Sequence, residues 1–184
     1  MTILTIITDT HIGNKYGQID CTLPNTYEEC VDTNTFLLGD IFDLARCEPD
    51  VLRKLKQRTQ LMHDVIAKGR YCHGNHDHLS NGLQDIWIGK GILGTHGDLA
   101  VDSAKWSDYR NKPQGRGTSW MQWLIAKNNG HLSKCEAKIL AEYAKQRGAH
   151  TIFTGHVHPK QTFDETINGV RVLCFKQGTT TIEV

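Results

Sequence analysis

The residues best suited to chemistry are histidines and aspartates that lie in short motifs rich in Gly and Asp. Ten histidines occur among the 184 residues, and five of them fall in such motifs. In chain order the motifs are Asp9-Thr10-His11, Gly39-Asp40-Ile41-Phe42-Asp43, Gly74-Asn75-His76-Asp77, Gly94-Thr95-His96-Gly97-Asp98 and Gly155-His156-Val157-His158. A mixture of imidazole and carboxylate ligands suits Mn²⁺, Fe, Zn²⁺, Ni²⁺ or Co²⁺ better than Ca²⁺. The motifs therefore predict a transition-metal site.

Each motif taken alone has an ordinary structural explanation. Asp9 beside an exposed His11 would fit an Asp that caps the next turn, and Asp40 would fit a loop residue ahead of a helix N-cap. In favour of ligation, extended backbone would point Asp9 and His11 to the same side, and the same alternation applies to His156 and His158. Five such motifs at strand ends rarely arise together for structural reasons alone, so we interpret them jointly as one site.

The elements that must position these motifs are predicted strands that end where the motifs begin. Runs of β-branched and apolar residues predict strands at residues 2–8, 35–38, 70–73, 92–95 and 150–154. Residues 86–88 precede a Gly-Lys-Gly turn and pair with 92–95 in a predicted hairpin. Asn168-Gly169 is a strong two-residue turn signal between strands at 161–167 and 170–175. Polar side chains are thus expected together at strand termini.

Two helices complete the predicted architecture. Apolar residues at helical spacing predict a crossover helix over residues 51–66. Ser133 and Glu136 form a capping box that starts a second helix, with Gly148 at its end. Crossovers and hairpins in one chain indicate an α/β (α+β) fold in which two mixed sheets pack face to face with helices outside. The length of 184 residues fits a single domain, 1–184.

Residues 99–131 interrupt this pattern. The segment interleaves aromatic residues, including Trp120, with basic residues that include Arg110 and Arg116. It predicts a cap or insertion over the site, in which these three residues would stack and hold a substrate. The alternative is a surface excursion whose aromatic side chains complete the core, since Trp is usually buried for packing reasons.

Composition excludes a strong global preference for polyanions. The chain has 21 Lys and Arg against 20 Asp and Glu, so no overall field attracts nucleic acid or an anionic membrane. Six cysteines without a CxxC pair indicate reduced thiols. The apolar N-terminus lacks the basic region of a signal peptide and is too short to span a bilayer. A cytoplasmic location and no membrane partner are the resulting expectations.

In their order, the motifs D-x-H, G-D-x-x-D, G-N-H-D, H-G-D and G-H-x-H resemble those of the calcineurin-like metallophosphoesterase superfamily over residues 9–158. The resemblance implies a four-layer αββα sandwich and two divalent metal ions, with Mn²⁺ as the first expectation. It implies that one ion is held by Asp9, His11 and His158, the other by Asn75, His96 and His156, and that Asp40 bridges them.

The same resemblance implies a hydrolytic mechanism. Two ions about 4 Å apart clamp both oxygens of an in-line displacement and lower the pKa of a shared water, so a metal-bridging hydroxide is the expected nucleophile. His76 would then protonate the leaving-group oxygen, and Asp43 would orient its ring. None of the cysteines is needed for this chemistry.

Details of the motifs favour some branches of the superfamily over others. Protein Ser/Thr phosphatases carry Arg-Gly where this chain has Leu44-Ala45. The motifs are closest in form to small phosphodiesterases and to UDP-2,3-diacylglucosamine pyrophosphatase-like enzymes, although the lipid A enzyme usually has Arg at the position of His76. We therefore expect a phosphodiesterase that acts on a small or nucleotide-like phosphoester. The alternatives are a phosphomonoesterase (phosphatase), a small metal-dependent nuclease and, more weakly supported, a non-catalytic binding scaffold.

Overall fold

The structure is a computed structural model that describes residues 1–11, 34–41, 69–77, 83–101 and 132–184. Its strands and long helix in these ranges are β1 (Ile3–Thr8), β2 (Thr35–Leu38), β3 (Tyr71–Cys72), β4 (Asp85–Gly89), β5 (Ile92–Thr95), α5 (Lys134–Gln146), β6 (Thr151–Thr154), β7 (Phe163–Ile167), β8 (Val170–Cys174) and β9 (Gly178–Glu183). The helix predicted over residues 51–66 lies outside the described residues.

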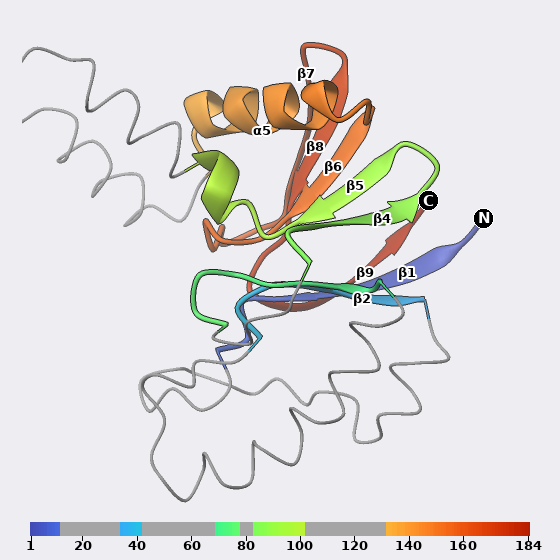
Figure 1. Cartoon of the computed structure of the whole chain (residues 1–184), viewed down its shortest axis with the longest axis vertical. Helices are drawn as coiled ribbons and strands as arrows, with labels where there is room; N and C mark the ends of the chain where they lie inside the picture. Colours follow the sequence, from blue (N-terminus) through green and yellow to red (C-terminus); the bar gives the residue numbers. More distant parts are fainter. Residues whose placement is uncertain (12–33, 42–68, 78–82, 102–131) are drawn as a thin grey trace, which may run out of the picture.

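Two mixed β-sheets face each other in the described part of the chain (Figure 1). The four-stranded sheet has the order β3-β2-β1-β9, in which the first three strands are parallel and β9 is antiparallel to β1. The five-stranded sheet has the order β4-β5-β6-β8-β7, with a parallel centre and an antiparallel strand at each edge. The expected α/β fold with face-to-face mixed sheets is confirmed.

Alternation along the central strands produces two separate cores. On β6, Phe153 points between the sheets, where it meets the ring of Phe175 at a centroid distance of 5.2 Å. Its neighbour Ile152 points to the opposite face and packs beneath α5. The inter-sheet core contains Leu4, Ile6, Phe36, Leu38, Cys72, Ile86, Phe153, Leu173 and Phe175. Because β6 is covered on both faces, all four of its residues are buried.

Helix α5 covers the outer face of the five-stranded sheet (Figure 1). Its first turn contains both hydrogen bonds of the predicted capping box, from the Glu136 nitrogen to the Ser133 hydroxyl and from the Ser133 nitrogen to the Glu136 carboxylate. At the other end, the Tyr143 hydroxyl and Arg147 both donate to Asp85 of β4. These contacts fix α5 to the edge of the sheet.

The strands predicted from the sequence are present, with shifts of one or two residues at their ends. Strand β9 was not predicted, although it forms the edge of the four-stranded sheet beside β1. Residues 98–101 form a helical turn, and Ala100 and Val101 are buried in the core beneath α5. Within the segment 99–131, Ala100 and Val101 therefore belong to the core, whereas Leu99 is exposed. Residues 102–131 lie outside the described residues.

Candidate metal centre

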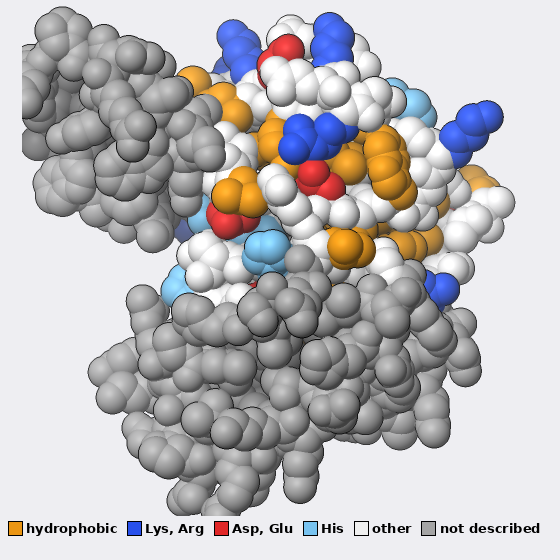
Figure 2. Space-filling view, in the orientation of Figure 1, with side chains coloured by type: hydrophobic (Ala, Val, Ile, Leu, Met, Phe, Trp, Pro, Cys, Tyr) orange, Lys and Arg blue, Asp and Glu red, His pale blue; other side chains and the backbone are white. Residues whose placement is uncertain are grey.

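The two sheets place five of the predicted motifs around one edge. Because β1, β2 and β3 are parallel, their carboxyl ends meet on one side of the first sheet, and those of β5 and β6 meet in the second. Asp9 and His11 follow β1, Asp40 follows β2, Asn75 and His76 follow β3, His96 follows β5, and His156 and His158 follow β6. Figure 2 shows histidine side chains reaching the surface in the region where the sheets meet.

One group of potential ligands forms around Asp9. Its side chain is fully buried, and Oδ1 lies 2.9 Å from Nε2 of His158. Nε2 of His11 lies 3.4 Å from the same nitrogen of His158. The three residues each offer a ligand atom, and these atoms all lie within 4.8 Å of one another. A carboxylate and two imidazoles at this separation suit a transition-metal ion.

A second group forms around Asp40, which is also buried. Oδ2 of Asp40 lies 3.2 Å from Nε2 of His96 and 3.8 Å from Nε2 of His11. Asp40, His96 and His156 again offer ligand atoms within 4.8 Å of one another. Since its carboxylate contacts members of both groups, Asp40 is placed to be shared between two ions.

The turn after β3 carries the remaining two motif residues. The His76 nitrogen donates to Oδ1 of Asp40 at 2.7 Å, and the His76 ring meets the ring of His11 edge-on at 4.8 Å. His76 also belongs to a group of possible ligands with His11 and Asp40. Asn75 lies on the same turn and is exposed. The position of His76 is therefore compatible with either metal ligation or proton transfer.

The backbone at the candidate ligands is left-handed, which corrects the argument from strand alternation. Asp9, His11, Asp40, His156 and His158 have φ angles of 54°, 46°, 49°, 67° and 50°. Only Asn168 joins them among the described non-glycine residues with positive φ. Such conformations cost about 1–3 kcal/mol and cluster at functional sites. The side chains converge because the chain turns sharply after each strand, and not because it continues extended.

Glycines in the motifs allow the loops to approach one another. A Cβ at Gly39 would lie 2.6 Å from the His96 ring, and one at Gly74 would lie 2.6 Å from the Asp40 nitrogen. A Cβ at Gly155 would collide with Thr8 and Asp9. The motif glycines are required by this packing, beyond the tight turn that the sequence suggested.

The electrostatics of the site favour bound positive charge. Burial alone would raise the pKa of Asp40, but the adjacent His96 imidazole, together with the backbone hydrogen bond from His76, outweighs it and lowers the pKa to about 2. Burial would lower the pKa of His96, yet Asp40 and Asp9 raise it to about 10. Burial lowers the pKa of His11. The buried carboxylates thus remain ionised and draw a cation towards them.

The donor set also fits a metal on structural grounds. Nε2 of His96 is buried and, despite its 3.2 Å separation from Asp40, has no partner with hydrogen-bond geometry. Its Nδ1 lies 2.9 Å from the carbonyl oxygen of Leu38, which it can reach as a donor. Without a metal, the raised pKa of His96 keeps its ring protonated. A bound cation would displace the Nε2 proton, and the hydrogen bond from Nδ1 to Leu38 would then leave the Nε2 lone pair for the metal.

A profile of the calcineurin-like phosphoesterase family matches residues 3–160, which covers every motif described above. The chain belongs to the calcineurin-like phosphoesterase family. Membership in this family, together with the candidate ligand groups of His and Asp, supports a metal-dependent phosphoester hydrolase. Comparison with curated proteins gave no match.

Several solved structures are similar to this phosphoesterase-family chain. A conserved uncharacterised protein of Streptococcus pneumoniae, described as a predicted phosphoesterase, is 16% identical over 100% of this chain and 85% of that chain, with a TM-score of 0.48. A double mutant of Vps29 from Entamoeba histolytica is 14% identical over 96% of this chain and 74% of that chain, also with a TM-score of 0.48. Wild-type Vps29 from the same organism, complexed with Zn²⁺, is 16% identical over 96% and 74%, with a TM-score of 0.43.

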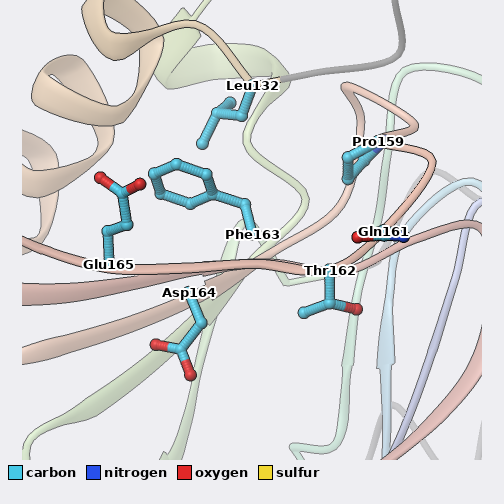
Figure 3. Close-up of a pocket in the computed structure, with 7 residues that line it drawn as sticks. All are labelled: Leu132, Pro159, Gln161, Thr162, Phe163, Asp164 and Glu165. Carbon is cyan, nitrogen blue, oxygen red and sulfur yellow. The ribbon is translucent and has the colours of Figure 1, made fainter.

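A shallow pocket of about 230 Å³ lies close in the chain to the last candidate ligand, His158. It is lined by Leu132, Pro159, Gln161, Thr162, Phe163, Asp164 and Glu165 (Figure 3). In this view Phe163 points towards Leu132, whereas Asp164 points to the other side of β7. The carboxylates at the rim make this hollow a poor surface for a polyanion.

Four predicted site residues lie outside the described residues: Asp43, Arg110, Arg116 and Trp120. No described helix is both long and apolar enough to cross a membrane. A set of threonine hydroxyls at the site was not predicted from the sequence. Thr8, Thr10 and Thr154 are fully buried and directly precede, separate or adjoin motif residues. Their position next to motif residues in the sequence is the signal from which a role at the site could have been predicted.

Proposed function

We propose that this chain hydrolyses phosphodiesters with two divalent transition-metal ions, acting on a small or nucleotide-like substrate. The observation that carries the proposal is the pair of ligand groups around Asp9 and Asp40, which adjoin through His11. One ion would be held by Asp9, His11 and His158, and the other by Asn75, His96 and His156, with Asp40 between them. Mn²⁺ is the first candidate from the family resemblance, and Fe, Zn²⁺, Ni²⁺ or Co²⁺ also suit a set that mixes imidazole with oxygen donors.

The bound ions would neutralise charge on the phosphate oxygens and lower the pKa of an attacking water. The protein's part is to hold the ligands rigidly before substrate arrives. The backbone nitrogen of His156 donates to both oxygens of Asp9, at 3.1 and 3.0 Å, which joins the loop of one sheet to that of the other. The nitrogen of His76 restrains Asp40 in the same way. Both carboxylates thus face inward in a fixed orientation, so little reorganisation is needed on binding.

His76 is proposed to donate the proton to the leaving-group oxygen. Its backbone is tied to Asp40, while its ring is half-buried beside His11 and so lies at the boundary between the site and solvent. An imidazole at this boundary can pass a proton to a leaving-group oxygen while it stays within reach of water. We propose that Asp43 orients the ring, as the family resemblance implies.

The experiment that tests the function begins with chelator-treated protein. Metal content is measured after reloading with Mn²⁺, Zn²⁺, Ni²⁺ or Co²⁺, and turnover of bis-p-nitrophenyl phosphate is compared with that of p-nitrophenyl phosphate. We expect two ions per chain and faster hydrolysis of the diester. An exposed histidine outside the site, His150, supplies a matched control, since His150→Ala should retain both metal content and rate.

Other outcomes would replace the proposal with a specific alternative. Preference for the monoester would indicate a phosphatase. Cleavage of single-stranded oligonucleotides that is lost in Arg116→Ala or Trp120→Ala would indicate a nuclease. Absence of turnover with every divalent metal would indicate a binding scaffold.

A further inference from the structure

Three buried threonine hydroxyls connect the loops that carry the candidate ligands. Thr8, Thr10 and Thr154 have no exposed surface, and each hydroxyl reaches a backbone carbonyl at the end of a neighbouring strand or in the loop that follows it. Burying a hydroxyl is unfavourable unless it is hydrogen-bonded. Valine has nearly the same shape and would fill the same volumes without that requirement, so packing alone does not explain the choice of threonine at these positions.

Thr10 joins the two loops of the four-stranded sheet. It lies between Asp9 and His11, and its hydroxyl donates to the carbonyl of Ile41, the residue after Asp40, at 2.8 Å. Two backbone hydrogen bonds continue the same connection, from the Asp9 nitrogen to Gly39 at 3.0 Å and from the His11 nitrogen to Asp40 at 2.9 Å. The Thr10 hydroxyl thus adds a third hydrogen bond between the loop after β1 and the loop after β2.

Thr154 makes the equivalent connection in the five-stranded sheet. Its hydroxyl donates to the carbonyl of His96 at 2.7 Å, and the following nitrogen, of Gly155, donates to the same oxygen at 3.1 Å. The main chain of His96 is thereby fixed to the loop that presents His156 and His158. Thr8 is a less selective link, because its single proton can go either to the Leu38 carbonyl at 2.9 Å or to the Asp9 carboxylate at 2.8 Å.

We propose that Thr10 and Thr154 are positioning residues for metal binding, one in each sheet. Thr10 sets the spacing of Asp9 and His11 from Asp40, and Thr154 sets the spacing of His96 from His156. The proposal rests on the proposed function to the extent that the ligands bind metal. It adds that affinity depends on two hydroxyls that do not touch the ion.

The test compares Thr10→Val and Thr154→Val, which lose the hydroxyl and keep the shape, with Thr10→Ser and Thr154→Ser, which keep the hydroxyl. Thr151→Val is the matched control, since Thr151 is a buried residue at the opposite end of β6 whose hydroxyl lies 3.0 Å from Nδ1 of His150. The dissociation constant for Mn²⁺ is measured by calorimetry on chelator-treated protein, and the melting temperature of the metal-free protein is recorded alongside it.

We expect each valine variant to bind Mn²⁺ about 10–100-fold more weakly, the range typical of residues that orient metal ligands. The serine variants and Thr151→Val should retain the wild-type affinity. A serine variant that weakens binding as much as its valine counterpart would overturn the proposal, because the hydroxyl would then not be the determinant. Valine variants with unchanged affinity would do the same. If a valine variant does not fold, the serine variant at that position can still contradict the proposal, because a loss of affinity of about 10–100-fold with the hydroxyl kept would overturn it.

The outcomes separate this inference from the proposed function. Wild-type protein that binds Mn²⁺ without hydrolysing either model ester would contradict the function, while the affinity comparison would still test the threonines. Hydrolysis with unchanged affinity in the valine variants would contradict only the threonine assignment. Wild-type protein that binds no divalent ion would contradict both.

Discussion

Replacing Gly74 by Ala tests how closely the turn after β3 packs against the candidate ligands. A Cβ at this position would lie 2.6 Å from the Asp40 nitrogen and 2.7 Å from Cδ2 of His96, and would overlap the Asp40 carboxylate. Ordinary contact begins at 3.4 Å. The Asp40 nitrogen and Cδ2 of His96 must therefore retreat by about 0.7–0.8 Å, and the Asp40 carboxylate must retreat further. The His96 side chain is fully buried, so it has no free space into which it can move.

Overpacking of this kind costs about 1–3 kcal/mol, so the free energy of unfolding of the metal-free protein should fall by that amount. A displacement of about 1 Å at a catalytic centre can cost about 100-fold in rate, and we expect diester turnover to fall on that scale. Urea unfolding and bis-p-nitrophenyl phosphate hydrolysis measure the two effects.

Gly89→Ala is the control for the same substitution in β4. Its Cβ would meet only Ile92 Cδ1, at an ordinary distance of 3.7 Å. Gly89 does not have the positive φ that would strain an alanine, so stability and turnover should be unchanged or slightly raised. If Gly74→Ala were as stable and as active as the wild type, the close approach of the Gly74 turn to Asp40 and His96 would be refuted.

Three further substitutions test separate parts of the reasoning. His76→Ala should lower diester turnover by about 10²–10⁴-fold with metal content unchanged, and loss of metal would instead make His76 a ligand. Asp40→Asn should shrink the stabilisation by Mn²⁺, which in the wild type reaches about 2.7 kcal/mol at an ion concentration 100 times the dissociation constant; undiminished stabilisation would contradict sharing of Asp40. Tyr143→Phe should cost about 1 kcal/mol at pH 7, because it removes the hydrogen bond to Asp85. Burial and the charge of Asp85 raise the pKa of Tyr143 from 10.0 to about 12, so its contribution is complete below pH 10 and is lost as pH rises towards 12. Urea unfolding across this range should show a steeper decline for the wild type than for the variant, and parallel curves would contradict the assignment.

Local signals in the sequence account for most of the described framework. The capping box at Ser133 and Glu136 was predictable because both hydrogen bonds lie within one turn of the chain. Asn168-Gly169 predicted the β7–β8 hairpin for a similar reason, since positive φ angles of 52° and 83° suit these two residues. Strands β1, β2 and β6 were evident because each is a short apolar run that is buried along most of its length.

Elements that depend on distant partners were not accessible in this way. Strand β9 alternates regularly between covered and exposed positions, but it lacks an apolar pattern because its covered positions are Gly178, Thr180 and Ile182. Its partner is β1 at the other end of the chain, where Leu4 pairs with Ile182. The burial of Ala100 and Val101 beneath α5 likewise depends on tertiary contacts. From the sequence, these two residues were assigned to the cap or insertion because aromatic and basic residues follow them.

The candidate site shows how a sound choice of residues can rest on an incorrect local argument. Alternation in an extended strand would have placed Asp9 and His11 on one face, but both lie in left-handed turns beyond β1. Asp is among the residues that tolerate this conformation best, and His is also enriched there, so the motif composition carries a backbone signal as well as a chemical one. In the turned geometry the nitrogen of His156 points at the Asp9 carboxylate, a contact that no spacing rule along one strand could supply. Ligand identity was therefore predictable from residue type and order, whereas the orientation of each ligand depends on hydrogen bonds between loops that the two sheets bring together.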